Sequence, residues 1–123
     1  MNTQPSARVH SYEERGTFVV VVSGEFDVEE QELLLAAWGE AERRNLPVTA
    51  VDLSGVTFGD SSFLNGLSQG WLRHRDSGRK LVMAGPLHPR LERLLDLTGV
   101  LEHFDTVASL ADALTDSPEE PAG

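Results

Sequence analysis

Hydroxyl and carboxyl side chains gather at Asp60-Ser61-Ser62, where an apolar run gives way to a helical pattern formed by Phe63, Leu64, Leu67, Trp71 and Leu72. The first turn of a helix has backbone N–H groups without internal partners and a partial positive charge, so side-chain oxygens and phosphate groups are stabilised there. Ser61 is therefore predicted to carry an accessible hydroxyl beside Asp60. The alternative is that Asp60 or Ser61 only caps the helix, the ordinary role of these residue types at this position.

Catalytic use of these side chains has little support in the sequence. Ser54, Ser61 and Ser62 have no local base and no Gly-x-Ser-x-Gly elbow, so a serine hydrolase is disfavoured. Asp27 and Asp60 could form an acid and base pair, but two acidic helix caps are the plainer account. We expect no enzymatic activity, and a small hydrolase that uses Ser61 stays as the enzymatic alternative.

Metal and cofactor sites are not expected either. The chain has no cysteine, and its four histidines lie on different predicted elements, without short spacings, at His10, His74, His88 and His103. We interpret them as surface or edge residues and predict no metal site. Gly66 and Gly70 fall inside a helical pattern, where close packing explains them better than a phosphate loop does.

Charge and hydropathy limit the partners. Twenty acidic residues against ten basic ones give a net charge of −10, which argues against nucleic acid because phosphate backbones are held chiefly by Lys and Arg. Six basic residues cluster in the second half of the chain: Arg73, Arg75, Arg79, Lys80, Arg90 and Arg93. We interpret them as a solvated helix face, and the alternative is a docking patch for an acidic partner. No apolar run is long enough to cross a membrane and no signal peptide is visible, so we expect a cytoplasmic protein.

The remaining pattern predicts an α/β fold with a mixed, partly parallel sheet of about four to five strands and helices packed on it. One domain is expected over residues 8–115, between a flexible N-terminus (1–7) and a flexible acidic tail (116–123). Strands are predicted at Arg8–Tyr12, Thr17–Ser23, Val48–Leu53 and Lys80–Ala84, and helices at Val28–Arg43, Ser61–Arg75, His88–Thr98 and Ser109–Leu114. Leu101, Phe104 and Val107 are expected to cover the sheet edge.

Two of the predicted strand ends share an edge of the sheet. Asp27, which forms a capping box with Glu30, follows one strand through the loop 24–27, and Asp60 follows its parallel neighbour through the small-residue loop 53–60. Loops at the carboxyl ends of parallel strands meet, so we expect Asp27 to lie near Ser61. Phe58 is predicted to fill the core, whereas the direction of Phe63 stays open.

The residues Asp-Leu-Ser-Gly-Val-Thr-Phe-Gly-Asp-Ser-Ser (52–62), preceded by Gly-Glu-Phe-Asp (24–27), resemble the STAS domain of bacterial anti-sigma factor antagonists. The similarity covers roughly residues 8–115, in the family's order and spacing. It implies a non-enzymatic stress-response regulator whose serine after the Asp, here Ser61, is phosphorylated by an anti-sigma factor that is also a serine kinase. Ser62 is the competing acceptor. One departure is Phe63, where the family usually has Gly.

The resemblance also implies partner switching in the control of transcription. The unphosphorylated protein would bind the kinase and free a sigma factor, and the phosphorylated form would let go; a phosphatase would reverse the modification. Asp27, Asp60, Ser61, Ser62 and Phe63 are the residues expected to contact the partner. The alternative is a STAS module that does not switch and serves as a scaffold of a stress-signalling complex or binds a small ligand.

Overall fold

A computed structural model describes residues 7–115 of the chain, except for the side chains at 101, 103 and 115. Our expectations for residues 1–6 and for the tail from residue 116 lie outside these residues. The strands are β1 (Ala7–Glu14), β2 (Thr17–Phe26), β3 (Val48–Gly59), β4 (Lys80–Ala84) and β5 (Asp105–Val107). The α-helices are α1 (Gln31–Arg44), α2 (Ser61–Asp76), α3 (Pro89–Thr98) and α4 (Leu110–Thr115), and two 3-10 helices are η1 (Val28–Glu30) and η2 (Val100–His103).

The five strands form one sheet in the order β1-β2-β3-β4-β5. β1 pairs with β2 antiparallel through a tight hairpin, and the other three pairings are parallel. Helical crossovers connect the parallel strands, because a parallel pair needs a long connection. The predicted mixed sheet in an α/β fold is confirmed. The segment expected only to cover the edge contributes the fifth strand.

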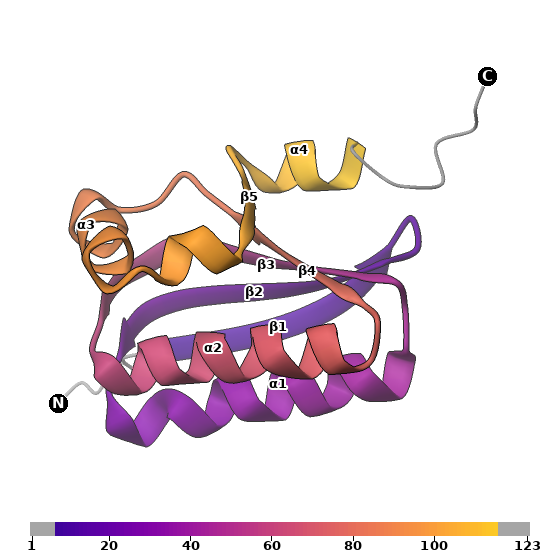
Figure 1. Cartoon of the computed structure of the whole chain (residues 1–123), viewed down its shortest axis with the longest axis horizontal. Helices are drawn as coiled ribbons and strands as arrows, with labels where there is room; N and C mark the ends of the chain where they lie inside the picture. Colours follow the sequence, from indigo (N-terminus) through magenta and orange to yellow (C-terminus); the bar gives the residue numbers. More distant parts are fainter. Residues whose placement is uncertain (1–6, 116–123) are drawn as a thin grey trace, which may run out of the picture.

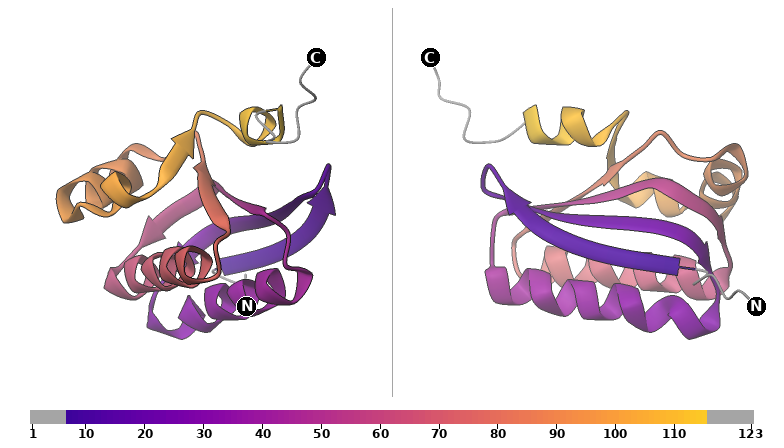
Figure 2. Two further views of the ribbon diagram at one scale, coloured as in Figure 1. Left: turned by 45° about the vertical axis from the view of Figure 1, so that its right-hand side comes forward. Right: turned by 180° about the vertical axis from the view of Figure 1, so that it is seen from behind.

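Helices α1 and α2 lie side by side on one face of the sheet, and α4 lies on the other side (Figure 1, Figure 2). The main core lies between the sheet and the pair α1/α2; it includes Phe18, Trp38 and Leu67. A smaller cluster beneath α4 contains Val48, Ala50, Val82 and Ala113. Both faces of the central strands are therefore covered, as their nearly continuous apolar sequence predicts.

Two glycines allow α1 and α2 to approach closely, as the sequence predicted. A Cβ added to Gly66 would lie 2.9 Å from Leu34 Cδ1, and one added to Gly70 would lie 2.4 Å from Trp38 Cε2. The Trp38 indole also donates a buried hydrogen bond of 2.8 Å from Nε1 to the Gly66 carbonyl. Because these two positions have no side chain, the helices can lie close together. The hydrogen bond to Gly66 satisfies the indole N–H, the only polar group of the Trp38 side chain.

The two central strands extend further than the sequence indicated. The segments 24–27 and 53–60 were expected to be loops, but β2 continues to Phe26 and β3 to Gly59. The pairing between them shifts register at two places, between Val21 and Ser23 and again between Gly24 and Glu25. These bulges accommodate the glycines that made the segments look like loops, since strand glycines often mark such irregularities.

Candidate functional site

The carboxyl ends of β2 and β3 meet directly in front of the proposed site. Phe26 pairs with Gly59 in the parallel ladder, and the Asp60 N–H donates a hydrogen bond of 3.2 Å to the Phe26 carbonyl. Asp27 and Asp60 are the next residues of the two adjacent strands. The helices that they begin, η1 and α2, therefore start at the same edge of the sheet.

Both carboxylates cap the helices that follow them. Asp60 Oδ1 accepts hydrogen bonds from the backbone N–H groups of Ser62 (2.8 Å) and Phe63 (3.2 Å). Asp27 Oδ1 accepts one from Glu29 N–H (3.1 Å), and Glu30 Oε1 accepts one from Asp27 N–H (3.1 Å), which completes the predicted capping box. A side-chain hydrogen bond with Glu30 raises the pKa of Asp27. The capping role considered for these residue types is thus present.

The two candidate serines differ in accessibility. Ser61 is the first residue of α2 and is exposed, whereas Ser62 is half-buried and gives its backbone N–H to Asp60. Of the two residues, Ser61 is thus the more accessible from solvent.

Phe63 points into the core, which settles the direction left open by the sequence. Its side chain is 0% exposed, and its ring lies 5.2 Å from the Phe26 ring, measured between centroids. A Cβ added to Gly59 would come within 2.4 Å of the Phe63 ring, so Gly59 provides the space for it. We expected Phe63 to contact a partner; because the ring is inaccessible, it supports the edge by packing instead.

Phe58 shows the opposite deviation. It was predicted to fill the core, but its side chain is 47% exposed, because β3 follows the bulged register at its end and turns Val56 inward instead. Phe58 borders an open hollow of about 490 Å³ between the end of β3, α2 and α3. Its other lining residues are Gly59, Asp60, Ser61, Leu64, Arg90, Leu91, Leu94 and Thr98.

Sequence reasoning missed the contribution of α3 to this hollow. The sequence order could have indicated this contribution. Helix α3 begins at Pro89, with His88 as its N-cap, soon after β4 ends at Ala84, so it begins at the same edge of the sheet at which β2 and β3 end. The His88 imidazole caps the helix by accepting a hydrogen bond from Arg90 N–H. The apolar spacing of α3 predicts that Leu91, Leu94 and Leu95 point inward; Leu91 and Leu95 are buried, whereas Leu94 is only half-buried and lines the hollow.

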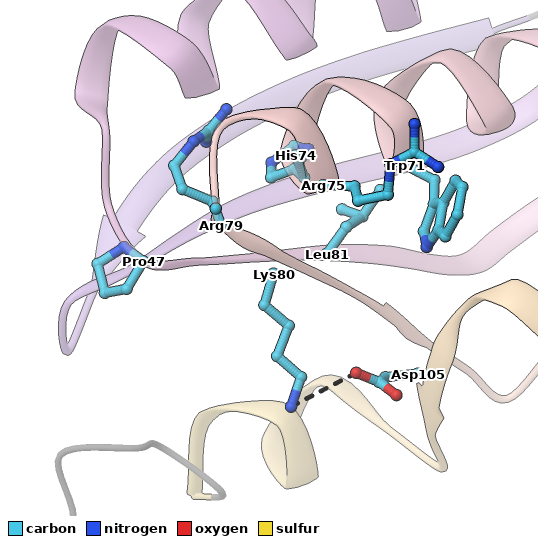
Figure 3. A pocket seen from close by; sticks show the side chains of 9 residues that line it. Pro47, Trp71, His74, Arg75, Arg79, Lys80, Leu81 and Asp105 are labelled. Carbon is cyan, nitrogen blue, oxygen red and sulfur yellow. Dashed lines mark ion pairs between the residues drawn. The ribbon is translucent and has the colours of Figure 1, made fainter.

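A second hollow, of about 360 Å³, lies at the opposite edge of the sheet, near Pro47, Trp71 and Lys80 (Figure 3). The Arg75 guanidinium stacks over the Trp71 ring at 5.0 Å, and Lys80 forms an ion pair with Asp105 (3.4 Å). Most cations of this region are thus engaged within the protein.

Two residues near the second hollow are more buried than the sequence predicted. Arg79 is not part of a solvated face: its Nη1 donates to the Ala41 carbonyl at the end of α1 (3.2 Å), and burial lowers its pKa. His74 is also buried rather than at the surface. Its Nδ1 lies 2.7 Å from the Gly70 carbonyl and its Nε2 lies 2.8 Å from Thr49 Oγ1, and burial lowers its pKa.

Within residues 7–115, no group of three His, Cys, Asp or Glu side chains is placed to hold a metal ion. None of the helices in this part of the chain is long and apolar enough to span a membrane.

Comparison with known proteins assigns the family. Residues 10–116 match the family described as Mlab, STAS domain. A crystal structure of an anti-sigma factor antagonist from Mycobacterium paratuberculosis is 31% identical, with a TM-score of 0.75 over 90% of this chain and 93% of that one. The chain belongs to the STAS domain family, which includes anti-sigma factor antagonists.

More distant structures share the fold. The anti-sigma factor antagonist SpoIIAA in its unphosphorylated form is 14% identical, with a TM-score of 0.68 over 89% of this chain and 96% of that one. The phosphorylated form of SpoIIAA, described as a Bacillus cell fate determinant, is 13% identical, with a TM-score of 0.68 over 89% of this chain and 100% of that one. No curated protein matches the sequence.

Proposed function

We propose that this protein is an anti-sigma factor antagonist that binds an anti-sigma factor with serine kinase activity in the cytoplasm. The observation that carries the proposal is the exposed Ser61 at the start of α2, on the rim of an apolar hollow bordered by Phe58. An accessible hydroxyl beside exposed apolar surface suits a protein partner, since contiguous exposed apolar groups mark interaction sites. The 31% identical antagonist supports this role.

In this proposal the partner phosphorylates Ser61. Ser61 Oγ forms a bond to the γ-phosphorus of ATP, the bond from that phosphorus to the bridging oxygen of ADP breaks, and the hydroxyl proton is released. Phosphoserine adds about −1.5 to −2 charges and three acceptor oxygens. These charges arise next to Asp60 and on the same edge as Asp27. The partner then meets a more negative surface and dissociates, and a phosphatase resets the protein.

The fold is expected to survive the modification. The Ser61 hydroxyl lies at the surface, at the positive end of α2, so added phosphate displaces no core side chain. SpoIIAA, which has a similar fold, is described in phosphorylated and unphosphorylated forms. Binding rather than folding is therefore the property that should change.

Affinity capture with four baits tests the proposal: wild type, Ser61→Ala, Ser61→Asp and Ser11→Asp. Ser11 is an exposed residue of the edge strand β1, so its substitution adds the same charge away from the site. Wild type, Ser61→Ala and Ser11→Asp should recover an anti-sigma factor kinase, and Ser61→Asp should not. Recovery of the same proteins by all four baits would contradict switching.

A second candidate function is a module that does not switch and binds a small ligand or acts as a scaffold. The open hollow of about 490 Å³ favours it, because its volume falls within the range of ligand sites. Under this alternative, Ser61→Asp would leave protein partners unchanged.

A further inference from the structure

Arg90 occupies a position that fold stability does not explain. It stands in the first turn of α3, where the helix dipole disfavours a positive charge. Its guanidinium makes no ion pair or hydrogen bond with any described part of residues 7–115, whereas Arg43, Arg44, Arg73 and Arg75 all have carboxylate partners. The side chain is exposed and lines the same hollow as Ser61.

A phosphate on Ser61 would need such a charge. The N–H groups of Ser62 and Phe63 already donate to the Asp60 carboxylate, and the N–H of Leu64 donates to the Asp60 carbonyl. Few donors in the first turn of α2 are thus left for phosphate. The Asp60 carboxylate would repel it, and the remaining wall is largely apolar. Among the described residues that line the hollow, Arg90 is the only cation.

We propose that Arg90 is an internal receptor for a phosphate group on Ser61. The guanidinium is planar and presents paired N–H donors that match phosphate oxygens, which makes arginine well suited to this contact. Pairing draws the Arg90 side chain from α3 toward the start of α2. It thereby crosses the hollow and covers the apolar surface of Phe58, Leu64 and Leu94.

This inference rests on the proposed modification of Ser61 and gives it a second effect. Phosphorylation not only makes the edge more negative; it also removes a free cation and an apolar hollow from the partner-binding surface. The partner is then released because attractive contacts are lost and because the added charge repels it. Interfaces commonly combine such attractive and repulsive elements to discriminate between two states or partners.

The test uses purified full-length protein with phosphoserine inserted at position 61 during translation, so that no kinase or partner is needed. The second pKa of the phosphate is followed by ³¹P NMR at low salt in three backgrounds: wild type, Arg90→Gln and Arg93→Gln. Arg93 is the matched control, because it is an exposed arginine of the same helix without an ion pair among the described residues and does not line the hollow.

Arg90→Gln should raise the phosphate pKa by about half a unit or more, because a nearby cation favours the dianion. Arg93→Gln should leave it unchanged, and Arg90→Lys should keep part of the effect. Asp60, the other charged residue in the described lining of the hollow, is the same in all backgrounds. Equal titration in the Arg90→Gln and Arg93→Gln proteins would overturn the proposal.

Methyl NMR of Leu64 and Leu94 reports on the closing of the hollow. Their signals should move on phosphorylation in wild type and stay in place in Arg90→Gln. If Arg90→Gln changes the phosphate pKa but the methyl signals do not move on phosphorylation, the proposal that Arg90 covers the hollow is wrong. Because these readouts need no partner, failure of the capture experiment and failure of the Arg90 contact are distinguishable.

Discussion

The rings of Phe26 and Phe63 pack with their centroids 5.2 Å apart and join the last residue of β2 to the first turn of α2. Both side chains are 0% exposed. Asp27 follows Phe26, and Ser61 lies two residues before Phe63, so this contact fixes the two parts of the proposed binding edge relative to each other. A bulky residue after Asp-Ser-Ser thus supports the site from beneath.

Phe63→Ala should lower the free energy of unfolding by about 3–5 kcal/mol, the range for truncating a buried aromatic ring. Phe63→Leu, which keeps more of the volume, should cost less. Urea denaturation followed by circular dichroism measures both. A loss of less than about 1 kcal/mol in Phe63→Ala would show that the ring is not needed for packing.

Gly59 and Phe63 should be energetically coupled. A Cβ at position 59 would lie 2.4 Å from the Phe63 ring, so Gly59→Ala should destabilise the wild type. In the Phe63→Leu background the same substitution should cost less, with a coupling of about 0.5–3 kcal/mol in a double-mutant cycle. Additive effects would mean that the ring and the glycine do not share this space.

The helix pair α1/α2 offers a test with an internal control. Gly70→Ala should destabilise by about 1–3 kcal/mol, because its Cβ would clash with Trp38. Gly39→Ala should stabilise by about 0.5–1 kcal/mol, since Gly39 lies in α1 and the nearest atoms to a Cβ there are the ends of the Arg43 and Arg73 side chains at 4.0 Å. Thermal unfolding compares the two; changes of the same sign would contradict the packing described.

Stability should fall as the pH drops below about 6.5 because of His74. Burial lowers its pKa in the folded protein below the ordinary value of 6.5. The unfolded chain therefore takes up the proton first, and stability present above that value is lost as the pH falls, by at most about 1.4 kcal/mol per pH unit. Neighbouring charges are Glu42, Arg73 and Arg79. His74→Gln should flatten the dependence, whereas substitution of the exposed His10 should retain it.

The sequence predicted the order and type of β1 to β4 and of the four α-helices because their signals are local. Apolar periodicity marked α1, α2 and α3, and Asp27 and Asp60 marked where helical segments start. The positions of Gly66 and Gly70 inside a helix indicated close packing before any contact was known.

The site was less predictable because it depends on contacts between distant residues. The bulges between β2 and β3 turn Phe58 outward, and no local pattern reports the register that produces them. The approach of Arg90 and Leu94 to Ser61 requires the placement of α3 beside β3. The burial of Arg79 and His74 similarly involves partners that are distant in the sequence, the Ala41 carbonyl and the Thr49 hydroxyl.

Regulation through Ser61 is tested most directly by the affinity of the protein for the anti-sigma factor recovered in the capture experiment. Isothermal titration calorimetry gives the dissociation constant of the complex for the protein with phosphoserine at position 61 and for the protein without it. We predict at least about 100-fold weaker binding of the phosphorylated form, or about 2.7 kcal/mol. Equal affinities within about twofold, a difference of roughly 0.4 kcal/mol, would contradict regulation through Ser61.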